Sequence, residues 1–190
     1  WSCIHGIERW KNDCGCNSGG NSNWNQQWRQ PLRNALDWLG EQLESCYLDG
    51  VSELLKDPWG ARNEYINVML DRSENNVAEF LFSHSLKPLD EDASVKVLSL
   101  LEMQRHAMLM YTSCGWFFDE LSGLETIQII QYAARAIQLA ERYCDKDIEP
   151  GFLALLALAK SNITEYANGA EIYTRFVKPA MINLIKVGAH

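Results

Sequence analysis

Residues 93–111 read ASVKVLSLLEMQRHAMLMY, the longest sustained helical pattern in the chain. Its apolar residues recur at spacings of three and four, as they do on the buried face of an amphipathic helix. Asp90 or Asp92, just before this stretch, is a residue type that caps helix N-termini. The sequence therefore predicts a helix from about Ala93 to Tyr111.

Weaker helical patterns lie on both sides of it. Pro31 suits a first helical turn, and a stripe of leucines follows it to about Tyr47: Leu32, Leu36, Leu39 and Leu43. Further helices are expected near 51–56, 61–70, 76–82, 124–143, 149–160 and 169–187. Ser73 should cap the third of these six, and Pro179 should bend the last. No segment alternates as a strand would, so we predict an all-α, multi-helix bundle of about six to eight helices.

Residues 1–30 have a different character from the rest. They are rich in Gly, Asn, Ser, Cys and Trp, and residues 17–23 are a dense run of turn formers. We expect an irregular loop region over 1–30 and a helical bundle over 31–190, together forming one domain. The loop holds a group of tryptophans that we expect to form an exposed apolar patch: Trp1, Trp10, Trp24 and Trp28.

The net charge of −8 argues against binding to nucleic acid or to an anionic membrane surface. No apolar stretch approaches the ~20 residues of a membrane span. Cys46, Cys114 and Cys144 occur singly among helical residues and are expected to be small buried thiols. These features predict a reduced, cytoplasmic protein and leave neutral ligands such as sugars open.

A cluster of possible metal ligands lies in the loop: Cys3, His5, Cys14 and Cys16. Thiolates and imidazole are the donors that zinc prefers. Neither pair has the two-residue gap of a zinc knuckle, however, which favours thiols packed in a tight glycine loop with His5 bonded to the backbone. We therefore expect no metal or other cofactor, and we retain this cluster as the alternative.

Two other groups of residues could carry chemistry. On the helix over 93–111, Glu102, Arg105 and His106 can share one face, as an acid–base site or as a structural ion pair between helices. At the following break, Trp116 with Asp119 and Glu120 could stack a sugar ring and accept from its hydroxyls. The other reading of this break is a helix–helix corner in which a carboxylate caps the next helix.

Several of these segments together resemble a known family. They are residues 1–10 (WSCIHGIERW), 13–16 (DCGC), 24–33 (WNQQWRQPLR), 101–106 (LEMQRH), 111–118 (YTSCGWFF) and 132–137 (YAARAI). The pattern is similar to the helical region behind the catalytic barrel in a bacterial branch of glycoside hydrolase family 57. The resemblance covers nearly the whole chain.

The resemblance implies an α-glucan-active enzyme of amylase or glucanotransferase type, acting with retention. Its two catalytic carboxylates would lie in a β/α barrel before Trp1, so this chain should be inactive alone. The partners implied are that barrel, in the same polypeptide, and an α-glucan or oligosaccharide. Trp116 and Asp119 would contribute to the substrate cleft, together with His5 and Trp10. The alternatives are a metal-binding or redox-sensing helical module and a purely structural cap.

Overall fold

The computed structural model describes residues 3–181, and within them the chain is all-α, as predicted. The α-helices are α1 (Arg29–Val51), α2 (Pro58–Glu64), α3 (Ile66–Leu70), α4 (Glu74–His84), α5 (Glu91–Leu109), α6 (Leu124–Ala140), α7 (Ile148–Leu156) and α8 (Gly169–Ile172). Short 3₁₀ turns are η1 (Glu8–Trp10), η2 (Ser113–Trp116), η3 (Thr164–Tyr166) and η5 (Lys178–Ala180). A π-helical turn, η4 (Tyr173–Val177), follows α8 directly.

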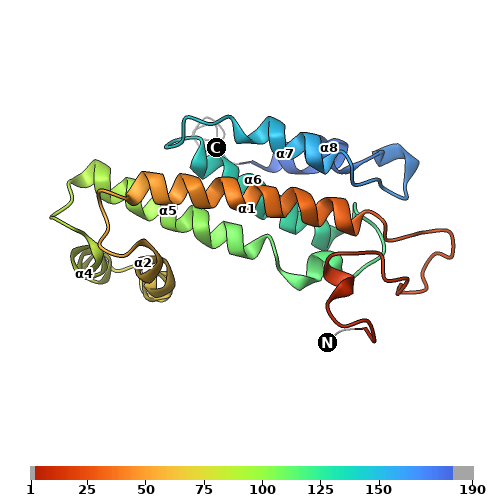
Figure 1. Cartoon of the computed structure of the whole chain (residues 1–190), viewed down its shortest axis with the longest axis horizontal. Helices are drawn as coiled ribbons and strands as arrows, with labels where there is room; N and C mark the ends of the chain where they lie inside the picture. Colours follow the sequence, from red (N-terminus) through yellow and green to blue (C-terminus); the bar gives the residue numbers. More distant parts are fainter. Residues whose placement is uncertain (1–2, 182–190) are drawn as a thin grey trace.

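Helix α1 is the centre of the bundle. It lies between α5 on one side and α7 on the other, and α6 packs against α5 (Figure 1). The predicted leucine stripe of α1 is fully buried: Leu32, Leu36, Leu39 and Leu43. Inside this apolar core, Gln104 of α5 donates a hydrogen bond from Nε2 to the Leu43 carbonyl at 3.1 Å. The contact satisfies a buried amide and fixes α5 against α1.

Capping side chains set the starts of three helices, and two of these caps were predicted from the sequence. The Asp90 carboxylate accepts from the Ala93 N–H at 2.8 Å, so α5 begins at Glu91. Ser73 accepts from the Asn76 N–H and caps α4, as predicted. Asp57 does the same for α2, with Pro58 at the first helical position.

Two helix predictions need correction. The separate helix expected over 51–56 does not form, because α1 continues to Val51 and the chain then turns. The helix expected over 61–70 is two helices, α2 and α3, which meet at Tyr65. The buried ring of Tyr65 packs on Phe80 and its hydroxyl donates to Glu102 at 3.0 Å, so tertiary contacts coincide with the break.

The last predicted helix changes form instead of continuing. After α8 the backbone passes through η4 and then η5, which contains Pro179. A proline within a helix removes one hydrogen bond and crowds the preceding turn, which accounts for the change at this position. The remainder of the predicted helix, to 187, lies outside the described residues.

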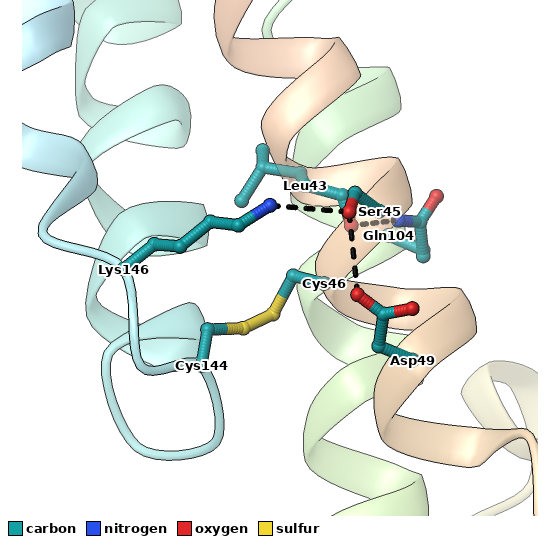
Figure 2. Close-up of a disulfide and its surroundings, with 7 residues drawn as sticks. All are labelled: Leu43, Ser45, Cys46, Asp49, Gln104, Cys144 and Lys146. Carbon is teal, nitrogen blue, oxygen red and sulfur yellow. Dashed lines mark hydrogen bonds between the residues drawn. A yellow bond between two sulfur atoms is a disulfide. The ribbon is translucent and has the colours of Figure 1, made fainter.

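The expectation that Cys46, Cys114 and Cys144 are buried thiols is wrong. Cys46 on α1 and Cys144, just after α6, form a disulfide whose Cα atoms are 5.8 Å apart. Cys114 is exposed. Figure 2 shows the bridge beside a polar chain in which Lys146 donates to Ser45, and Ser45 donates to Asp49. The disulfide joins residues 98 apart in sequence, and therefore ties the loop before α7 to the central helix.

None of the helices between residues 3 and 181 combines the length and the apolar character that crossing a lipid bilayer requires.

Candidate functional site

The irregular N-terminal segment (residues 3–28) covers one end of the bundle, where α1 begins and α5 ends (Figure 1). Long-range hydrogen bonds attach it to residues 113–122, which we call the corner. Arg9 donates to the Phe117 carbonyl at 2.9 Å, and Trp28 Nε1 donates to the Asp119 carbonyl at 3.2 Å. Segments about a hundred residues apart in sequence therefore build one surface.

The two carboxylates of the corner are buried and are used within the chain. Asp119 accepts from the backbone N–H of Ser18 at 2.7 Å and also from the Ser18 hydroxyl. Glu120 accepts from the Asn162 N–H at 2.9 Å and from the hydroxyls of Ser122 and Ser161. Neither carboxylate caps α6, whose N-cap is Gly123. The corner is thus a junction between the N-terminal segment and the loop before η3.

Trp116 is a core residue in this conformation. Its side chain is only 1% exposed, and its Nε1 has no hydrogen-bond partner. The adjacent Gly115 packs so closely on Ile129 of α6 that an added Cβ would lie 2.8 Å from Ile129 Cγ1. The corner is therefore pressed against α6, and the Trp116 ring does not form an open surface for a sugar.

The predicted tryptophan patch is also corrected. Trp28 is buried, because its indole enters the core and its N–H reaches Asp119, while Trp10 and Trp24 are partly buried. Trp1 lies outside the described residues. The large apolar side chains exposed at this end include Ile4 (95%), Ile7 and Phe118 (44%).

The segment also gathers the predicted metal-ligand cluster. One donor atom from each of Cys3, His5, Cys14 and Cys16 lies within 4.8 Å of all the others. Cys3 Sγ is 3.8 Å from Cys14 Sγ and 3.7 Å from His5 Nδ1, and Cys16 Sγ is 3.4 Å from the same nitrogen. His5 therefore faces the thiols, not the backbone, and the four side chains converge on one point.

The thiols of this cluster differ in acidity. Desolvation opposes ionisation of Cys3, but hydrogen bonds from the His5 backbone and side chain and from Cys14 and Cys16 lower its pKa from 9.0 to about 7. Desolvation raises the pKa of Cys16, and its bonds to Cys14 and Cys3 add to that effect. Of these two thiols, Cys3 therefore ionises more readily than Cys16.

The second predicted group, on α5, is an ion network centred on Glu102. Glu102 bonds Arg105 at 2.7 Å, lies 3.7 Å from His106 Nε2, and also pairs with Arg72 at 3.7 Å. Burial lowers the pKa of His106; nearby Glu102 opposes this, whereas Arg105 and Arg135 add to it. His106 lines a cavity of about 350 Å³ beside Gln128, Gln131 and other residues of α6. The network therefore has the form of the structural ion pair.

Sequence reasoning missed the partners of the corner. Ser18, Ser161 and Asn162 carry no motif, and only their hydrogen bonds to Asp119 and Glu120 reveal them. Asn162 also exchanges hydrogen bonds with Asn25, closing the junction. The sequence offered one signal that such partners exist, the pair of adjacent carboxylates beside consecutive aromatics. Carboxylates that are buried among aromatics require hydrogen-bond donors from elsewhere in the chain.

The chain belongs to the family described as a domain of unknown function, DUF3536, whose family model matches residues 24–190. That match begins within the N-terminal segment and includes the whole corner. No curated protein and no solved structure matches the chain.

Proposed function

We propose that this chain is the helical accessory domain of a glycoside hydrolase family 57-like, α-glucan-active enzyme, in which it completes the substrate cleft. The observation that carries the proposal is the convergence of the N-terminal segment and the corner at one end of the bundle. These are the segments that bear most of the resemblance to that family, and they lie about a hundred residues apart in sequence. Catalytic carboxylates would come from the barrel of the same polypeptide.

In this proposal the main role of the corner is to position the N-terminal segment. Trp116 anchors the corner in the core, and Asp119 fixes the N-terminal segment that carries His5 and Trp10. The ring beside them that is open to solvent is Phe118, which packs edge-on against Phe117 at 4.8 Å between ring centroids. Phe118 is therefore our first choice for the aromatic surface that meets a sugar or the barrel.

The test uses the native polypeptide, including the catalytic region proposed to precede this domain. Phe118→Ala should lower kcat/KM on a malto-oligosaccharide by about 2- to 10-fold, the range expected for losing an aromatic contact of about 0.5–1.5 kcal/mol. The matched control is Phe82→Ala, because Phe82 is 78% exposed but lies on α4, at the other end of the bundle. Its kcat/KM should not change.

The outcomes distinguish a cleft-completing domain from a purely structural cap. Equal activity in both variants, with a lower melting temperature for Phe118→Ala alone, would favour a structural cap that only covers barrel surface. A native polypeptide without α-glucan activity would contradict the enzyme proposal altogether. The isolated 190-residue chain serves as the negative control, and we expect it to turn over no glucan.

A further inference from the structure

We propose that Cys3, His5, Cys14 and Cys16 bind a single zinc ion in a tetrahedral site of three thiolates and one imidazole. The proposal is independent of the glycosidase assignment. It concerns a structural centre that fixes the N-terminal segment on the end of the bundle.

The spacing of the donor atoms is that of a zinc coordination shell. With Zn–S bonds of about 2.3 Å and a Zn–N bond of about 2.0–2.1 Å, a tetrahedron has S···S edges of about 3.8 Å and S···N edges of about 3.6 Å. The Cys3–Cys14 separation is 3.8 Å, and the two S···N separations to His5 are 3.7 and 3.4 Å. The other donor pairs lie within 4.8 Å, so a small closing movement would bring all four donors to bonding distance from one zinc ion.

A disulfide does not explain the arrangement. A bonded sulfur pair is about 2.05 Å apart, whereas Cys3 and Cys14 are separated by 3.8 Å and all three cysteines of the cluster are free. A disulfide would also leave one thiol over and give His5 no reason to turn its Nδ1 toward the sulfurs. Three sulfurs and one nitrogen that lie within 4.8 Å of one another are instead the donor set of a tetrahedral zinc site.

The backbone is shaped to present these ligands. Gly6 follows the first pair with φ of +64° and closes a turn in which its N–H donates to the Cys3 carbonyl at 3.1 Å. Gly15 separates Cys14 from Cys16 with φ of +76°, and its N–H donates to the Asp13 carboxylate at 3.0 Å. Positive φ is readily available only to glycine, so these two residues allow closely spaced ligands to converge despite the missing two-residue gap.

The surroundings suit the charge of the site. Three thiolates and a neutral imidazole around Zn²⁺ leave a net charge of about −1. Burial lowers the pKa of the fully buried Arg29 and nearby Arg9 adds to this effect, whereas the charges of three groups of this region oppose it: Cys14, Asp119 and Asp13. An anionic zinc centre nearby would offset part of the cost of burying this guanidinium.

Zinc here would have a defined structural effect. The two ligand pairs enclose η1, whose Arg9 donates to the Phe117 carbonyl, so closing the site also fixes this contact to the corner. A bound ion would therefore hold the segment that carries Ile4 and Ile7 in one conformation against the corner. This is a common role of closed zinc sites in small structural elements.

The test is metal analysis of the chain purified under reducing conditions without chelator. We expect stoichiometric zinc in the wild type and in Cys114→Ser, which alters an exposed cysteine outside the cluster. Cys14→Ser should lose the zinc while keeping the helical circular dichroism of the bundle. Three results would overturn the proposal. The folded wild type could be free of zinc after growth with added zinc, it could hold iron in place of zinc, or the Cys14→Ser variant could retain full zinc.

A second measurement covers the case in which Cys14→Ser fails to fold. Zinc is removed from the wild type with a chelator and replaced with Co²⁺. We expect the intense visible bands of tetrahedral cobalt together with thiolate-to-cobalt charge transfer, and their loss on adding equimolar zinc. The weak spectrum of octahedral cobalt would contradict the site.

Discussion

Asp119 accepts two hydrogen bonds from Ser18, one from the backbone N–H at 2.7 Å and one from the hydroxyl, across 101 residues of sequence. The carboxylate is nearly inaccessible to solvent, so it depends on these donors for its solvation. The pair joins the N-terminal segment to the corner, together with the hydrogen bonds from Arg9 and Trp28. It therefore contributes to holding that segment on the bundle.

Replacing Asp119 should therefore loosen the N-terminal segment. We expect Asp119→Ala to lower the free energy of unfolding by about 1–3 kcal/mol. This is the range for removing a buried partner and leaving the opposite hydrogen-bonding group unsatisfied. Ser18→Ala removes the hydroxyl alone and should cost less. In a double-mutant cycle followed by urea unfolding, the two changes should couple by at least about 0.5 kcal/mol, because they remove one shared contact. Strict additivity would show that the pair contributes nothing measurable.

Substitution of Trp116 and of Phe118 should change stability by very different amounts, although the two residues are close in sequence. Trp116 is buried, so Trp116→Ala leaves a large cavity and should cost about 3–5 kcal/mol of stability. Phe118 is largely exposed, and Phe118→Ala should change stability by less than about 1 kcal/mol. Thermal unfolding of both variants tests this directly. A Trp116→Ala protein that is as stable as the wild type would restore Trp116 as an open platform for substrate.

The sequence was most informative where local chemistry sets the structure. The leucine stripe of α1 and the caps Ser73 and Asp90 depend on neighbours within about four residues, and all were predicted. The break at Tyr65 and the burial of Trp28 depend on contacts with distant segments, and both were missed. Periodicity carries no information about such contacts.

The Cys/His cluster shows the same division in one site. Its four residues could be named from the sequence because their chemistry is distinctive. Their convergence could not, since the spacing rule assumes the turn of a zinc knuckle. Here the glycines at 6 and 15 adopt positive φ and bring the ligands together by a different backbone path.

The Cys46–Cys144 disulfide gives a prediction about stability and about the compartment. It closes a loop between residues 98 apart, and its loss should lower the free energy of unfolding by about 2–5 kcal/mol. Cys46→Ser should reproduce the effect of adding a reductant, whereas Cys114→Ser should leave the unfolding curve unchanged. Unfolding of all three proteins with and without reductant is the measurement.

The redox state of this pair in cells also tests the predicted cytoplasmic location. Disulfides are rare in reducing compartments, so alkylation of freshly lysed cells followed by mass analysis should find free Cys46 and Cys144 if the protein is cytoplasmic. A bridge that is already formed at lysis would count against that location. In either case the 5.8 Å between the two Cα atoms is within the range that a disulfide spans.

His106 should make stability fall with acidity. Its pKa is lowered in the folded chain, mainly by burial; Glu102 opposes this shift, and the cations Arg105 and Arg135 add to it. An unfolded histidine titrates near about 6.5, so between that pH and the lower folded pKa the unfolded chain binds more protons. Acidification through this window therefore favours unfolding, and the full loss of stability is reached below the folded pKa.

The variant His106→Gln cannot acquire this charge, so its stability should decline less than that of the wild type between about pH 7 and pH 5. Urea unfolding of both proteins across that range measures the difference, and parallel curves would show that His106 does not contribute to the acid sensitivity of the fold.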